Sequence, residues 1–115
     1  MEDKLIQILE KAGYPVYKQG SLSDDEDYPE AFFTFWNNET IEGAFYDNEN
    51  YSEIGDFDVN FYSSDPEQVY SELNKAKKEL KQNGYIITDA GHDIASDEPT
   101  HTGRGINVLV EQYQF

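Results

Sequence analysis

Apolar side chains recur at helical intervals in the first stretch of the chain, residues Asp3–Ala12. They form one stripe, made by Leu5, Ile6, Ile8, Leu9 and Ala12. This spacing is typical of an amphipathic helix, and Gly13 is the residue type that most often follows a helix end. Because Pro15 cannot continue a helix, Tyr14–Lys18 is expected to be a short extended segment.

The segment Ala31–Trp36, "AFFTFW", is apolar on both sides of an extended chain. Successive side chains of a strand alternate between its faces, so Phe33 and Phe35 point one way. Phe32 and Trp36 point the other way. We expect the central strand of a sheet, with one aromatic pair beneath the helices. The pattern leaves open which pair that is, and whether the second face is buried or contacts another molecule.

A second strand is predicted over residues 54–64, "IGDFDVNFYSS", where apolar and polar positions alternate. The apolar face holds Phe57, Val59 and Phe61, and the polar face holds Asp56, Asp58, Asn60 and Tyr62. Such alternation is typical of a strand with one buried side, the other being wet or in contact with a partner. The turn-rich stretch before it predicts a brief strand around Ala44–Tyr46.

A long helix is predicted to begin after Asp65. Asp65 is a good N-cap, Pro66 suits the first helical position, and Gln68 completes the spacing of a capping box. The buried stripe consists of Val69, Leu73, Ala76 and Leu80. Gly84 is expected to end the helix.

The last third of the chain predicts two more strands joined by a polar loop. The strands are residues 85–91, "YIITDAG", and residues 106–114, "INVLVEQYQ", and the loop is Gly91–Gly105. The order of elements predicts a single α+β domain over residues 1–115. Its sheet is expected to be twisted and mainly antiparallel, with four to five strands and two helices on one face.

The net charge of -16, from 24 acidic and 8 basic residues, limits the kinds of partner that the chain is expected to bind. Binding to DNA phosphates needs clustered cations, which this chain lacks. The acidic excess suits a basic protein partner, or a surface that DNA passes without specific binding. Aromatic residues make up 15% of the chain, which favours a folded domain over disorder. With neither a signal-peptide pattern nor a membrane-spanning run, we expect a cytoplasmic protein with no membrane partner.

No pattern in the chain predicts catalysis, a cofactor or a metal. The phrase "TGRG" is too short for a nucleotide-binding loop. Three polar residues of the predicted loop, His92, Asp93 and His101, lie near Asp97 and Glu98 but have no defined ligand spacing. A small enzyme or metal-binding domain is therefore the least favoured hypothesis.

Three segments of the sequence resemble a known family of proteins. They are "YPEAFFTFWNN", "DFDVNFYSSDPEQVYSELNKAKKELKQNGY" and "GINVLVEQY". Together they resemble the tail-terminator, or head–tail joining (tail completion), proteins of long-tailed phages and prophages of Gram-positive bacteria. The resemblance covers roughly residues 5–113 and rests on the order of elements and on the strand, Asp-Pro, helix, Gly-Tyr, strand segment.

The resemblance implies a structural role without catalytic residues. Such proteins form a homo-oligomeric ring, commonly a hexamer, that caps the tail tube and docks to the head connector. They are found in the host cytoplasm during assembly and in the tail and neck of the virion. The alternative that the charge leaves open is an acidic inhibitor or immunity-type protein that covers a basic partner.

The candidate interface residues come from the two predicted strands and from the polar loop. They are Phe32, Trp36, Asp56, Asp58, Tyr62 and Arg104. The aromatic residues offer apolar contact area, and arginine is enriched at protein interfaces. In a competing interpretation, Arg104 is an exposed turn residue between two glycines.

Overall fold

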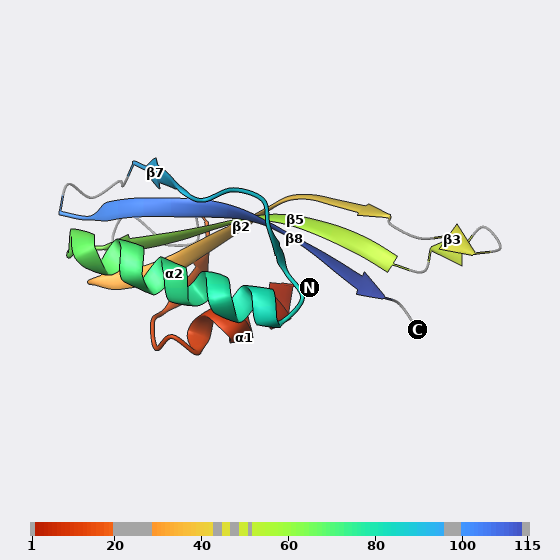
Figure 1. Cartoon of the computed structure of the whole chain (residues 1–115), viewed down its shortest axis with the longest axis horizontal. Coiled ribbons are helices and arrows are strands. Elements are labelled where there is room, and N and C mark those ends of the chain that lie inside the picture. The colour runs from red at the N-terminus through yellow and green to blue at the C-terminus, as the bar shows by residue number, and fades with distance from the viewer. Residues whose placement is uncertain are drawn as a thin grey trace.

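The computed structural model describes residues 2–19, 29–42, 45–46, 49–50, 52–95 and 100–113. Figure 1 shows the order of the elements along the chain. The elements are α1 (Glu2–Glu10), β1 (Val16–Lys18), β2 (Ala31–Glu42), β3 (Phe45–Tyr46), β4 (Glu49–Asn50), β5 (Ser52–Ser63), α2 (Pro66–Gln82), β6 (Ile86–Ile87), β7 (His92–Ile94) and β8 (Thr102–Tyr113).

The main sheet has six strands in the order β1-β2-β5-β8-β6, and β7 also pairs with β8. β1 runs parallel to β2, and the other pairs of this sheet are antiparallel. The α+β class is therefore confirmed, while the sheet is mixed and has six strands, not four to five. The strand that the sequence did not predict is β7, which is only three residues long and therefore too short for a periodic pattern to reveal.

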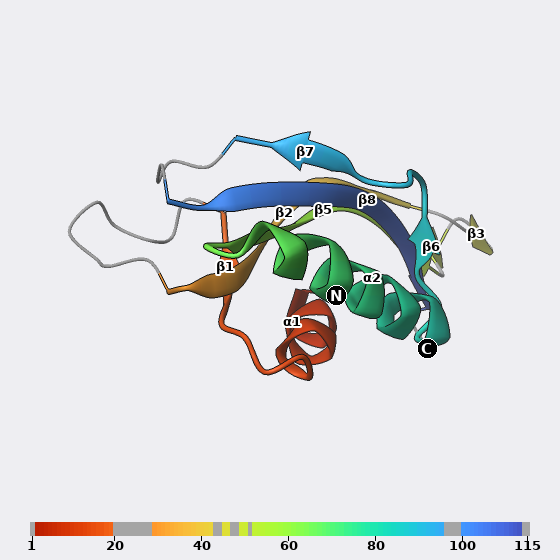
Figure 2. The ribbon, with the colours of Figure 1, turned by 60° about the vertical axis from the view of Figure 1, so that its left-hand side comes forward.

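Both helices cover the same face of the sheet, as Figure 2 shows. Phe33 and Phe35 are the aromatic pair that points toward the helices, and their partners across the sheet are Phe61 and Val59. The helices contribute Leu5, Ile8, Leu9, Val69, Leu73, Ala76 and Leu80 to this core. β5 is the central strand, and β2 lies one position out from it.

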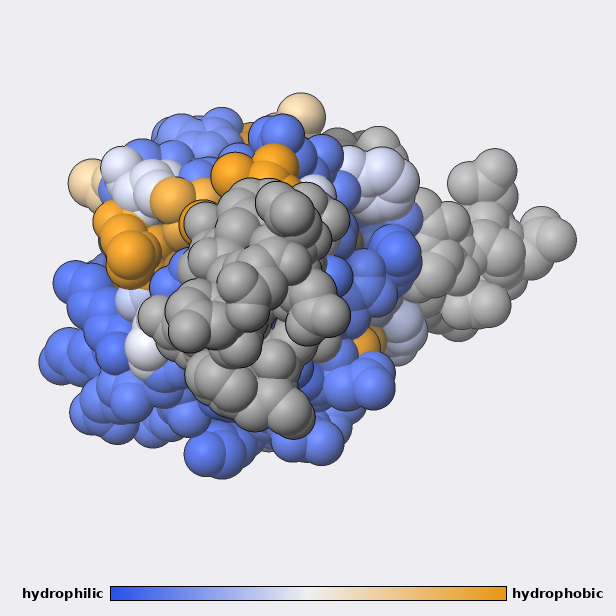
Figure 3. All heavy atoms as spheres, turned by 90° about the vertical axis from the view of Figure 1, so that its right-hand side faces the viewer, coloured by the Kyte–Doolittle hydropathy of each residue, from blue (hydrophilic) through white to orange (hydrophobic). Residues whose placement is uncertain are grey.

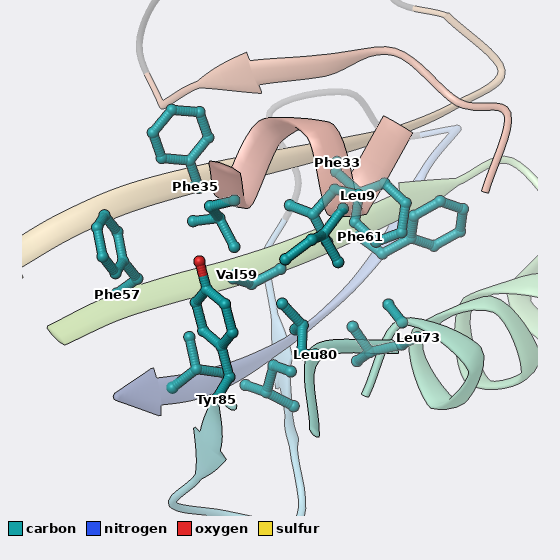
Figure 4. Close-up of a cluster of buried hydrophobic side chains, with 14 of the residues drawn as sticks. Leu9, Phe33, Phe35, Phe57, Val59, Phe61, Leu73, Leu80 and Tyr85 are labelled. Carbon is teal, nitrogen blue, oxygen red and sulfur yellow. The ribbon is translucent and has the colours of Figure 1, made fainter. Parts of the chain in front are cut away.

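Figure 4 shows the core side chains gathered between the sheet and the helices. Tyr85 joins them after the end of α2 and is only 4% exposed. Burial raises the pKa of its phenol above the ordinary value, because desolvation disfavours the charged form. The aromatic ring therefore serves as a core residue in its neutral state.

The start of α2 differs in one detail from the predicted capping box. The side chain of Asp65 accepts a hydrogen bond from the backbone N–H of Glu67 at 3.1 Å, as an N-cap should. Gln68 does not reach back to the cap. Its amide instead accepts a hydrogen bond from Ser63 Oγ at 2.6 Å and donates one to Tyr14 Oη at 2.8 Å. Gln68 thus ties α2 to the sheet and to the segment that leads into β1.

β2 is twice as long as predicted, because "NNETIE" continues the strand. Its pairing with β5 shifts register between Asn37 and Glu39, where β2 holds one extra residue. After a bulge of this kind, each side chain points to the face opposite the one that simple alternation would give it. Ile41 therefore lies on the same face of the sheet as Trp36, which simple alternation from Trp36 does not predict.

The predicted loop Gly91–Gly105 contains parts of two strands. β7 pairs with the first residues of β8, and Ile94 lies opposite Gly103. The strand predicted over residues 85–91 is reduced to β6. Asp97 and Glu98 lie outside the described residues, as does Ala44 of the predicted brief strand, of which β3 is described.

Candidate interaction surface

We call the side of the sheet opposite the two helices the open face. Strand alternation places Phe32 and Trp36 of β2 on it, because Phe33 and Phe35 point to the core. Their partners in β5 are Tyr62 and Asp58. Five of the six candidate interface residues thus share this face, Asp56 being the fifth.

At one end of the open face, aromatic rings pack against one another. The rings of Phe32 and Tyr62 are stacked, with centroids 5.2 Å apart, and Tyr17 meets Phe32 edge-on at 6.0 Å. His101 lies 6.1 Å from the Phe32 ring. Phe32 is only 3% exposed, so it supports this end of the face from within and does not form its outer surface.

Two glycines of β8 let these side chains lie close to the sheet. A Cβ atom on Gly103 would stand 2.7 Å from the Tyr62 ring, and one on Gly105 would overlap the Asn60 side chain. Glycine inside a strand often marks such a close approach. The phrase "GRG" therefore belongs to a strand, and its glycines serve packing and not a turn.

A polar cluster lies nearer the middle of the open face, around Asn107. The amide nitrogen of Asn107 donates to Asp56 Oδ1 at 2.6 Å and to Asp58 Oδ1 at 3.1 Å. Its amide oxygen accepts a hydrogen bond from Thr88 Oγ1 at 2.6 Å. The two carboxylates are thus oriented by a neutral donor, the amide of Asn107.

Exposed apolar side chains flank this polar cluster. Trp36 and Ile41 are each 46% exposed, and Ile86 is 63% exposed. Register pairs Ile41 with Ile54, and Ile86 with Leu109. Exposed apolar area of this kind commonly marks an interaction surface. Figure 3 shows most of the hydrophobic colour in the upper half of the molecule, away from the helix layer at the bottom.

The basic residues all lie on the helix side of the sheet. Six of the eight Lys and Arg residues are in α1, the turn after it, or α2. The other two are Lys18, which pairs with Glu2 of α1 at 3.2 Å, and Arg104, which stacks on Tyr70 of α2. The carboxylates of the open face, among them Asp56 and Asp58, thus face outward with no basic side chain beside them.

Arg104 was predicted to reach a neighbouring molecule, but the structure places it on the helix face with contacts inside the chain. Its guanidinium donates to Asp93 Oδ1 at 2.8 Å and to the carbonyl of Gly91 at 3.2 Å. It also lies 4.9 Å from the centre of the Tyr70 ring. These contacts tie β7 to α2, and they could not be read from the sequence because β7 itself was missed.

Replacing Arg104 with alanine is therefore expected to loosen β7 and leave any interface on the open face unchanged. The exposed ion pair and the cation–π contact are together worth about 1 kcal/mol. Urea unfolding should show a loss of that size, and amide exchange should rise in His92–Ile94. Loss of self-association with normal stability would contradict this internal role.

Two other properties of the described segments bear on the site. None of their helices is both long and apolar enough to cross a membrane. Across the same residues, no three His, Cys, Asp or Glu side chains are grouped so that they could hold a metal ion.

The comparisons with known proteins bear on the fold of this chain and not on its function. No protein-family model matches the chain, and no curated protein matches it. A solved structure that carries only a sequence identifier as its name covers 99% of this chain and 90% of its own. The sequence identity is 13% and the TM-score 0.52. At that identity the likeness concerns the fold alone.

Proposed function

We propose that this chain is a structural subunit of a phage or prophage neck, a tail-terminator or head–tail joining protein. It assembles into a ring that caps the tail tube and docks to the head connector. The observation that carries the proposal is the open face, which presents Trp36 and Ile41 beside carboxylates. A subunit of a ring needs such an exposed contact surface in its free form.

The charge of the chain supports the same role. DNA that leaves a capsid has to pass through the neck without being held there. Cationic walls would bind its phosphates, whereas a chain with 24 acidic and 8 basic residues repels them. The acidic excess therefore suits the passage of DNA without specific binding.

Assembly on the tail tests this function. The proposed function predicts a major tail protein among the neighbouring genes, and the purified chain is mixed with tail tubes made from that protein. Electron microscopy should show a ring at one end of each tube, and the capped tubes should stop growing. A chain that binds neither the tail tubes nor the head connector at micromolar concentrations would rule out the proposed function.

An acidic inhibitor is the second candidate, and the same open face favours it. A face with carboxylates, apolar side chains and neither lysine nor arginine also fits a basic active site of a toxin or nuclease. This function predicts tight binding, in a one-to-one complex, to a basic protein encoded beside the chain. Isothermal titration against such a protein distinguishes it from the ring, which requires contacts between identical chains.

A further inference from the structure

A groove runs between α1 and α2 on the outer side of the helix layer. Its volume is about 500 Å³, within the range of about 300–1,000 Å³ that is usual for sites that hold a small organic group. Ile8, Ala12 and Ala76 contribute apolar atoms to its walls. Its charged lining consists of three lysines and two glutamates, Lys11, Lys75, Lys78, Glu72 and Glu79. Lys75 is paired with Glu72 at 3.2 Å, so the lining keeps a small excess of positive charge. An aromatic side chain therefore fits the groove in size and in chemistry.

The open face carries a group that matches this groove. Trp36 is the one tryptophan of the chain, and it is 46% exposed. Asp58 lies directly opposite it on β5, and Asp56 follows on the same face. The exposed indole is thus flanked by carboxylates, whereas the lysines in the lining of the groove outnumber the glutamates by three to two.

We propose that Trp36 of one subunit inserts into the α1–α2 groove of a second copy of this chain. The carboxylates beside Trp36 then lie against Lys78 of that copy, since Lys75 is paired with Glu72 of its own helix. This inference rests on the proposed ring, and it names the partner and the contact that build it. Tryptophan in a desolvated pocket is a frequent centre of binding energy at interfaces.

A second copy is the occupant that uses both surfaces at once. An unrelated basic partner would cover the open face but would leave the groove of the helix layer empty. A copy of the chain offers an acidic face without lysine or arginine and a groove with a small positive excess on opposite sides of the same subunit. Such a head-to-tail contact continues from copy to copy, and it closes into a ring when the rotation at each step allows it.

The experiment uses two variants of the full chain, Trp36→Glu and Lys78→Glu, in sedimentation velocity over a range of concentrations. Trp36→Glu should weaken self-association about 30-fold or more, the usual effect of losing a central tryptophan. Lys78→Glu should weaken it about tenfold, because it places like charges opposite each other. Both side chains are exposed, so circular dichroism should show an unchanged fold.

Two matched controls separate this contact from general effects of charge or aromatic loss. Lys81→Glu makes the same charge change on α2 outside the groove. Tyr70→Ala removes an aromatic side chain of similar exposure, 51%, from the side of α2 that faces Arg104. Both controls should associate as the unmodified chain does.

Mixing the two variants gives the decisive result. The Trp36→Glu chain keeps an intact groove and the Lys78→Glu chain keeps an intact Trp36, so one unweakened contact remains. At concentrations where each variant alone is monomeric, the mixture should form heterodimers that grow no further. Rings formed equally well by both variants would overturn the contact and leave the proposed function standing. An unmodified chain that stays monomeric at every concentration would also overturn the contact, while capping of tail tubes tests the function separately.

Discussion

Replacing Phe61 with alanine is expected to lower the free energy of unfolding by about 3–5 kcal/mol, the largest effect of any single substitution considered for this chain. Its side chain is fully buried at 0% exposure. The ring lies 4.7 Å from the ring of Phe33 and meets Tyr14 edge-on at 5.2 Å. Truncation removes these contacts and leaves a cavity between β5 and the helix layer, which the surrounding strands cannot fill.

Urea unfolding followed by circular dichroism measures this loss, and Trp36→Ala is the matched control. Both substitutions remove an aromatic ring from the sheet, but Trp36 is 46% exposed on the opposite face. Its loss should cost about 1 kcal/mol or less, the usual range for side chains outside the core. Equal losses for the two variants would mean that the helices do not pack on the face that Phe61 occupies.

The part of the fold that the sequence predicted well depends on local, repeated signals. α2 carries an N-cap, a proline at its first position and an apolar stripe, and each signal involves residues close in the chain. The alternation in residues 54–64 likewise identified Phe57, Val59 and Phe61 as one buried face. Hydrophobic periodicity reports which side of an element is buried, so these predictions required no knowledge of the partner elements.

The part that the sequence could not predict depends on pairing between distant residues. "AFFTFW" is apolar on both sides, so its pattern could not say that Phe33 and Phe35 face the helices. The bulge that turns Ile41 to the open face is a property of the β2–β5 register. The contacts of Arg104 inside the chain were hidden for a similar reason, because its partners come from β7 and α2.

The sequence predicted which kinds of residue occupy the candidate surface, but it did not predict how their side chains pack. Five of the six candidate residues lie on one face because side chains along each of the two strands alternate between its faces. The α1–α2 groove had no sequence signal, since its walls come from two helices that are far apart in the chain. The packing of Phe32 beneath Tyr62 was also hidden, because it needs the space left by Gly103.

Replacing Gly103 with alanine is expected to lower the free energy of unfolding by about 1–3 kcal/mol, the usual cost of overpacking. The new Cβ atom would stand 2.7 Å from Cε1 of Tyr62 and 2.8 Å from Cγ1 of Ile94. Neither neighbour moves away easily. The Tyr62 ring is stacked on Phe32, and Ile94 is held in β7, opposite Gly103 itself.

A double-mutant cycle with Tyr62→Ala tests whether the ring is the cause of this loss. If the Tyr62 ring blocks the methyl group, Gly103→Ala should cost at least 1 kcal/mol less in the Tyr62→Ala background, because contacting residues are energetically coupled. Gly105→Ala serves as the control, and it should cost less because the Asn60 amide in its way can rotate. Purely additive losses would place the strain at Ile94 and β7, and would show that the aromatic end of the open face does not depend on the glycine beneath it.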